Sequence, residues 1–123
     1  MKKALLMMLA AGLVVGLAGF GTAADDKAPK AKYTVKQIMK QAHGKGLLKK
    51  VVSGKASDKD KLKLLDLYIS LLENKPKKGS AASWAKLSGS LVYATARVAA
   101  GRDGSIGMLK KASSCGGCHK AHK

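Results

Sequence analysis

The sequence has few acidic and few aromatic residues. Its 123 residues include 7 Asp and Glu against 24 Lys and Arg, a formal charge of +17, and aromatic side chains make up only 4%. A chain of this length holds one domain and buries only about two-thirds of its unfolded surface. The low aromatic content argues against a β-sandwich, and no segment alternates between apolar and polar residues as a half-buried strand does. We therefore predict one small helical domain whose core a bulky apolar cofactor helps to fill.

A long apolar run occurs at the N-terminus. Lys2 and Lys3 precede the 17-residue run 4–20, and small residues follow it up to Ala24. A charged start, an apolar middle and a small-residue end are typical of a secretory signal peptide. The run is shorter than the about 20 residues that span a bilayer, so cleavage near Ala24 is favoured over an uncleaved anchor. The sequence thus predicts a signal peptide at 1–24 and an exported, periplasmic protein.

Removal of residues 1–24 takes away only Lys2 and Lys3 among the charged side chains, which leaves a formal charge of +15. Most of the remaining cations are lysines, and they are scattered along the chain without aromatic residues that could stack on bases. This pattern does not favour a nucleic-acid partner. It favours docking on an acidic redox partner protein or contact with an anionic envelope surface, with a solvated lysine coat as the simpler interpretation.

Helical spacing begins after a flexible polar lead-in at 25–32. Thr34 is the expected N-cap of a first helix, whose apolar stripe moves to the opposite side across residues 44–46. That change predicts a sharp bend and a second short helical piece ending near Gly54. The residues of the first stripe are Val35, Ile38, Met39 and Ala42, and those of the second are Leu47, Leu48, Val51 and Val52.

Three further helices are expected. Ser57 to Asp60 resembles a capping box before the Leu-rich stretch 62–72, which ends before Pro76. The third helix carries apolar residues from Trp84 to Val98. A last helix begins near Asp103 or Ser105 and is predicted to run into residues 115–119 without a break.

Cys115 and Cys118 are the chain's only cysteines, and His119 follows directly. This C-x-x-C-H pattern is the attachment sequence for c-type haem. Two thiols three residues apart on one helical turn can add to the two vinyl groups at one haem edge, and the adjacent imidazole can then coordinate the iron from below. We therefore predict one covalent haem c held by Cys115 and Cys118, with His119 as the proximal iron ligand.

Other uses of this motif fit less well. A thioredoxin-like dithiol lies after a strand in a βαβ unit, whereas this motif ends a helical chain. A disulfide between Cys115 and Cys118 leaves His119 without a role. A zinc site would need a fourth ligand besides His122.

The ligand on the other side of the iron can be narrowed by elimination. Met108 and His122 are expected on the same helix as His119, so neither can reach the opposite face of the haem. Met39 and His43 remain, four residues apart on one side of the first helix. Met39 lies on the apolar stripe and His43 at its polar edge. Met39 as ligand, His43 as ligand and Met39 as an ordinary core residue all stay open at this point.

A C-terminal C-x-x-C-H motif on the last of four helices resembles the class II cytochromes c, over residues 33–123 and most specifically at 114–123. The resemblance implies an antiparallel four-helix bundle around one haem. Low-spin members take a Met from the first helix as sixth ligand, a position that Met39 matches, and some relatives form homodimers. The chain departs from the family at His122, where a Tyr or Phe is typical, and in its break at 44–46.

The resemblance implies a single-electron carrier rather than an enzyme. The alternative is a five-coordinate, gas-binding haem protein of the cytochrome c prime type. Less favoured are a small peroxidase, for which His43 is the one distal acid–base candidate, and a basic module that binds anionic envelope polymers. Around the motif, the lysines expected to dock an acidic partner are Lys110, Lys111, Lys120 and Lys123.

Overall fold

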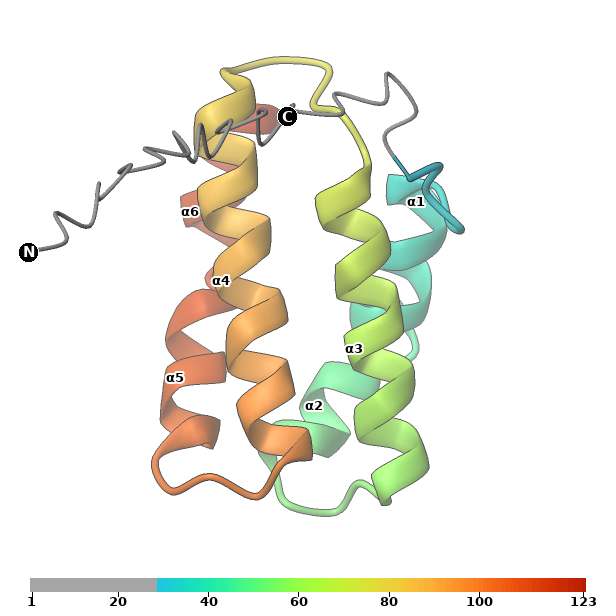
Figure 1. The fold of residues 1–123 in the computed structure, drawn as a ribbon, viewed down its shortest axis with the longest axis vertical. Helices are drawn as coiled ribbons and strands as arrows, with labels where there is room; N and C mark the ends of the chain where they lie inside the picture. Colours follow the sequence, from blue (N-terminus) through green and yellow to red (C-terminus); the bar gives the residue numbers. More distant parts are fainter. Residues whose placement is uncertain (1–28) are drawn as a thin grey trace, which may run out of the picture.

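The computed structural model describes residues 29–123, whose regular elements are all helices, with no strand among them (Figure 1). The all-α class predicted from the sequence is therefore confirmed. The predicted signal peptide and the first part of the lead-in lie outside the described residues. Within residues 29–123, no helix is long and apolar enough to cross a membrane. The elements are α1 Val35–Ile38, the π-helix η1 Met39–Gly44, α2 Leu47–Val52, α3 Asp58–Glu73, α4 Ala81–Ala99, α5 Ser105–Ala112 and α6 Cys115–His122.

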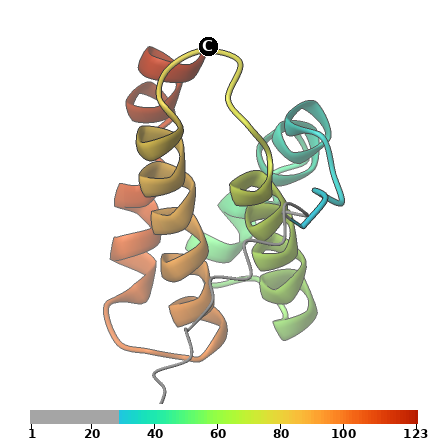
Figure 2. The same cartoon turned by 45° about the horizontal axis from the view of Figure 1, so that its top comes forward.

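The elements run alternately down and up the long axis of the molecule (Figure 1). The chain descends through α1, η1 and α2, ascends in α3, descends in α4 and ascends again through α5 and α6. Helix α3 packs against α4, and α4 packs against α5, while α1 and α2 contact α3. In Figure 2, α4, α5 and α6 lie on one side of the molecule and α1 and α3 on the other. Helix α6 therefore stands at the same end of the molecule as α1.

Local side-chain hydrogen bonds set the starts of two helices as predicted. The Thr34 hydroxyl accepts from the Gln37 backbone N–H at 3.2 Å, and the Gln37 side chain accepts from the Thr34 backbone N–H at 2.9 Å. Ser57 and Asp60 form the same reciprocal pair before α3, at 3.1 Å in both directions. These capping boxes satisfy backbone donors that have no partner inside the helix.

The predicted helix ends are also confirmed. Helix α3 ends at Glu73, two residues before the Lys75-Pro76 pair, because the residue before a proline is pushed out of helical geometry. Gly101 follows α4 with a φ of +69°, a left-handed conformation that glycine adopts without a steric cost. The Asn74 side chain donates to the Tyr33 carbonyl at 2.8 Å. This bond ties the end of α3 to the start of the first helix.

The first helical region differs from a plain α-helix. Residues 39–44 form a π-helix, and the Lys45 N–H bonds the carbonyl of Lys40, five residues earlier, at 2.9 Å. Gly46 then takes a φ of +72° and directs the chain into α2. The bend predicted at 44–46 is confirmed, whereas the π-helix was not predicted from the sequence. π-Helical turns are rare and often occur at functional sites.

The prediction of one unbroken last helix is wrong. Helix α5 ends at Ala112, and α6 begins at Cys115 after Ser114 adopts an extended conformation with ψ of 109°. The Ser113 hydroxyl donates to the Lys110 carbonyl at 3.1 Å. Serine side chains compete for backbone groups in this way and weaken a helix interior. Met108 therefore lies on a different helix from His119.

The core lies between α3, α4, α5 and the first helical region. Trp84 is buried, and its indole N–H donates to the Leu71 carbonyl at 3.1 Å. Small residues on the buried side of α4 bring it close to α3, and their hydroxyls bond to the preceding turn, as Thr95 does to the Leu91 carbonyl at 2.7 Å. The largest fully buried side chains are Tyr68, Ile38, Leu64, Leu67, Leu71 and Leu109.

Candidate functional site

The motif that the sequence singled out lies on α6, which has no buried residue. Cys115 and His119 are exposed, and Cys118 is half-buried against the core. Neither cysteine forms a disulfide. Burial raises the pKa of the Cys118 thiol, so this sulfur stays protonated at neutral pH. The helix thus presents two reduced thiols and an accessible imidazole within two turns.

The opposite side of the site is η1. Met39 and His43 are both half-buried, and Met39 packs against the core. A π-helical turn is wider than an α-helical one, so residues four apart still lie on one side of it. Met39 and His43, the two candidate ligands left by elimination, therefore lie on the same side of η1.

A cavity of about 250 Å³ lies between η1 and α6. The structure brings Met39, His43, Cys115, Cys118 and His119 together around it, although the sequence separates the first from the last by 80 residues. Apolar side chains of α3 and α4 close its inner side. The full lining consists of Met39, His43, Leu71, Leu91, Ala112, Ser113, Ser114, Cys115, Cys118 and His119.

The electrostatics of the cavity favour a neutral imidazole at His43. Burial of the His43 ring, together with the nearby positive charge that His119 can carry, holds the pKa of His43 below its usual value. A neutral imidazole has a free ring nitrogen and can ligate a metal. The two histidines are thus close enough to influence one another across the cavity.

Tyr68 does not line the cavity but lies next to its residue His43, and the sequence did not single it out. Its side chain is fully buried on α3, and its hydroxyl has no hydrogen-bond partner among the described residues. The His43 ring lies 6.2 Å away, centre to centre. Burial, with a smaller contribution from the Cys115 thiol, raises the pKa of the Tyr68 phenol above its usual range. The one feature of the sequence that could have drawn attention to Tyr68 is its polar hydroxyl in the middle of a Leu-rich helix.

His122 has a structural role on α6. Its Nδ1 lies 2.7 Å from the Lys78 carbonyl oxygen, and its Nε2 lies 3.1 Å from the Ser83 hydroxyl. The ring also meets Trp84 edge-on, with centres 5.3 Å apart. Because both ring nitrogens are engaged by residues outside the cavity, His122 holds the end of α6 against the start of α4.

Met108 also lies away from the cavity, in a separate shallow hollow beside Tyr93 on the outer side of α4 and α5. Neither Met108 nor His122 lines the cavity at the motif, for a reason other than the shared helix expected from the sequence. Helix α5 places Met108 in the hollow beside Tyr93. The two ring nitrogens of His122 contact Lys78 and Ser83 and hold the end of α6 in place.

Comparison of the chain with protein-family models, with curated proteins and with solved structures gave no match. The geometry of the cavity and the chemistry of its lining are therefore the basis for a functional conclusion.

Proposed function

We propose that this chain is an exported c-type cytochrome that holds one covalent haem in an antiparallel four-helix bundle and carries single electrons between redox partners. The observation that carries the proposal is the cavity between η1 and α6, where a C-x-x-C-H motif faces Met39 and His43. The resemblance of residues 33–123 to class II cytochromes c supports the same conclusion.

The lining residues fit a haem. Two thiols can form thioether bonds, and an imidazole with a thioether or second imidazole opposite it can serve as axial ligands. Within residues 29–123, no three His, Cys, Asp or Glu side chains gather as a bare metal ion would require. A porphyrin supplies four of the iron ligands itself, so one or two protein ligands suffice. Helix α6 buries no residue of its own, so an apolar group held at the cavity would give it a surface to pack against.

Each residue of the cavity has a defined task in this proposal. When bound, the haem supplies an iron that alternates between the ferrous and ferric states. Cys115 and Cys118 would anchor it through their thiols, and the His119 imidazole would ligate the iron. We assign Met39 as the ligand from the η1 side, with His43 as the second candidate because its neutral ring faces the same cavity. Leu71 and Leu91 keep water from the inner edge.

A second protein ligand such as Met39 or His43 would suit electron transfer, because an iron with all its ligand positions taken would not have to exchange a ligand when it changes oxidation state. No substrate pocket is then required, and we propose no enzymatic activity. The exposed lysines beside the motif form the surface on which an acidic partner docks, through attraction that weakens with salt. They are Lys110, Lys111, Lys120 and Lys123.

The first test is the mass and the absorption spectrum of the protein purified after expression with a haem-attachment system. We expect an intact mass that shows one covalent haem and loss of about 24 N-terminal residues. We expect low-spin spectra, a methionine–iron charge-transfer band in the oxidised protein, and no response to carbon monoxide. A chain without covalent haem would contradict the proposal.

Variants assign the sixth ligand. Met39→Ala should abolish the charge-transfer band, whereas Met108→Ala, which changes a methionine in a separate hollow, should leave the band intact. If the wild-type protein is low-spin without this band, and His43→Ala converts it to high-spin, His43 is the ligand. A high-spin wild-type spectrum that shifts with carbon monoxide would instead support the gas-binding alternative.

A further inference from the structure

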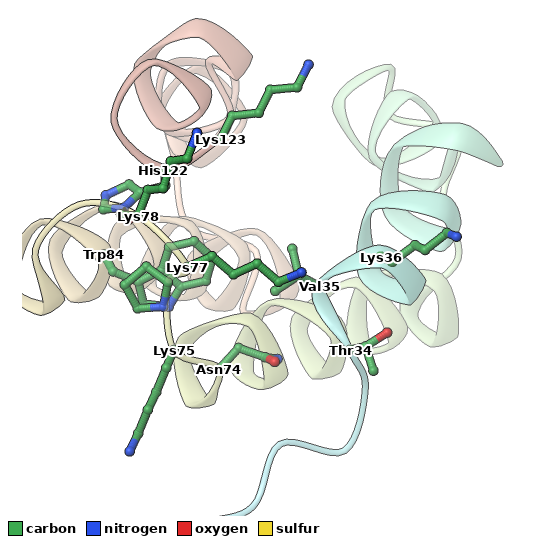
Figure 3. A pocket seen from close by; sticks show the side chains of 11 residues that line it. Thr34, Val35, Lys36, Asn74, Lys75, Lys77, Lys78, Trp84, His122 and Lys123 are labelled. Atoms are coloured by element: carbon green, nitrogen blue, oxygen red, sulfur yellow. Dashed lines mark hydrogen bonds between the residues drawn. The ribbon is translucent and has the colours of Figure 1, made fainter.

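A second cavity, of about 620 Å³, lies at the end of the molecule where α1 begins and α6 ends (Figure 3). We call it the Trp84 cavity. It shares no lining residue with the cavity at the motif, so the proposed function leaves it without a role. The lining consists of Thr34, Val35, Lys36, Asn74, Lys75, Pro76, Lys77, Lys78, Trp84, His122 and Lys123.

The inner wall of the Trp84 cavity is mainly apolar. Trp84 is only 7% exposed, and Val35 and Pro76 are half-buried. The polar groups at this depth already have partners, because the Trp84 indole N–H donates to the Leu71 carbonyl and both ring nitrogens of His122 are engaged within the protein. The interior therefore offers a ligand apolar surface, whose removal from water is favourable.

Lysines form the outer part of the Trp84 cavity. Five of them line it, all are exposed, and none takes part in an ion pair among residues 29–123. No Asp or Glu belongs to the lining, and the terminal carboxylate of Lys123 is the one acidic group on these residues. In Figure 3, Lys77 extends past Trp84 toward Val35, whereas Lys36, Lys75 and Lys123 extend outward. This excess of positive charge attracts an anion.

An apolar interior below exposed lysines is complementary to a molecule with an apolar body and an acidic end. The volume of about 620 Å³ lies within the range of about 300–1,000 Å³ that is typical of small-molecule sites. We propose that the Trp84 cavity binds a small amphipathic anion, of which an aliphatic carboxylate is the simplest case. Its chain packs against Val35, Pro76 and Trp84, and its carboxylate lies among the lysines.

A dissolved molecule fits the Trp84 cavity better than a membrane surface does. Proteins that bind at a bilayer interface bury exposed apolar side chains in it. The large apolar side chains that are exposed on residues 29–123 are Leu62, Ile69, Leu72, Tyr93 and Met108, and none of them lines this cavity. The apolar surface here is recessed, so a ligand has to enter the cavity to reach it.

The probe for the test is octanoate, and Trp84 is the reporter. Because Trp84 is the chain's only tryptophan, its indole N–H gives one identifiable signal in the ¹H–¹⁵N NMR spectrum of the purified, reduced protein. We expect octanoate to shift this signal in a saturable way. Acetate has the charge without the chain and octanol has the chain without the charge, so both should bind at least about tenfold more weakly.

Two double variants test the role of the lysines. Lys77→Gln/Lys78→Gln removes two cations from the lining, and Lys55→Gln/Lys59→Gln removes the same charge from exposed residues that do not line the cavity. We expect about fivefold weaker octanoate binding for the first variant and less than about a twofold change for the second. An unchanged Trp84 signal before octanoate is added shows that each variant is folded.

The outcomes decide the proposal without reference to haem, since the measurement needs none. A Trp84 signal that does not move at about 10 mM octanoate, equal binding of octanol, or equal weakening in the two double variants would each overturn the site. Binding of the protein to phosphatidylglycerol vesicles, with no effect of octanoate on Trp84, would assign the lysines to a membrane surface instead. Binding that requires both the chain and the lining lysines would support the proposal.

Discussion

The Tyr68 hydroxyl is buried on α3 without a hydrogen-bond partner among residues 29–123. A buried polar group without a partner costs about 1–3 kcal/mol of stability. The Tyr68 ring lies 6.2 Å from the His43 ring, centre to centre, so this cost falls beside the candidate site. Removal of this one oxygen atom therefore measures how the Tyr68 hydroxyl affects the stability of the core.

Tyr68→Phe should raise the free energy of unfolding by about 1 kcal/mol, because it removes an unsatisfied hydroxyl and keeps the ring. Denaturant midpoints of the wild type and the variant measure the effect. The control is Tyr93→Phe, which removes a hydroxyl from an exposed ring and should change stability little. A lower midpoint for Tyr68→Phe would show that the hydroxyl has a partner in the folded protein.

Residue identities and spacings alone predict the haem-attachment motif and the candidate ligands opposite it. The spacing of Cys115, Cys118 and His119 is local, so it could be interpreted without a structure. Whether Met39 faces this motif depends on how helices 80 residues apart in the chain pack. The structure places Met39 and the motif at one cavity. Tyr68 could not be identified, because a tyrosine in an apolar helix has the same sequence signature whether its hydroxyl reaches water or not.

At the scale of elements, α6 is held to the rest of the molecule by its end rather than by an apolar face. His122 contacts the Lys78 carbonyl, Ser83 and Trp84, while no residue of α6 is buried. The loop that receives it passes very close at Gly79. A Cβ atom on this glycine would lie 2.6 Å from both the Ala121 carbonyl oxygen and the His122 Nδ1. The position of the motif helix thus depends on one glycine.

Gly79→Ala should destabilise the protein more than the same change at Gly54. Both glycines have a positive φ, +80° and +75°, so an alanine costs about 1–2 kcal/mol of backbone strain at either position. At Gly54 nothing lies within 4 Å of the added Cβ, whereas at Gly79 the end of α6 has to move. We expect an additional loss of about 1 kcal/mol or more for Gly79→Ala, of the size that overpacking causes.

Chemical denaturation of the two variants measures this difference. Equal losses of stability would mean that α6 shifts without cost, which would contradict a fixed position for the motif helix. Because the difference between two glycines is compared, the strain common to both cancels.

For the whole molecule, charge is the dominant property. Lysines cover the described surface, and the acidic side chains form three ion pairs there, Lys32–Asp66, Lys50–Asp60 and Lys61–Asp58. All three have at least one partner that is largely exposed, and exposed pairs contribute little to stability. Repulsion between the many unbalanced cations therefore outweighs these attractions.

Salt should consequently stabilise the protein. Raising the NaCl concentration from about 10 to 150 mM shortens the Debye length from about 30 to 8 Å, which screens the repulsion of the positive surface. We expect the melting temperature to rise by several degrees, since about 1 kcal/mol corresponds to about 4–8 °C at this size. Calorimetry over this range measures it, and Lys55→Gln/Lys59→Gln, with two fewer cations, should show a smaller rise. A melting temperature that falls with salt would contradict this.

The sequence by itself determined the features that depend on neighbours in the chain. Thr34 and Ser57 each bond a backbone N–H three residues away, and Pro76 and Gly101 act on their own backbone, so helix starts and ends could be predicted. The C-x-x-C-H spacing is local in the same sense. These are interactions within about one helical turn, and their energies do not depend on the rest of the fold.

Only the tertiary structure decided where those helices lie relative to one another. Contacts between residues far apart in the chain bring Met39 and His43 to the same cavity as Cys115 and Cys118, and they bury the Tyr68 hydroxyl on α3. Such contacts form when side chains from several helices compete for the same core volume, and the periodicity of one segment carries no information about its partner.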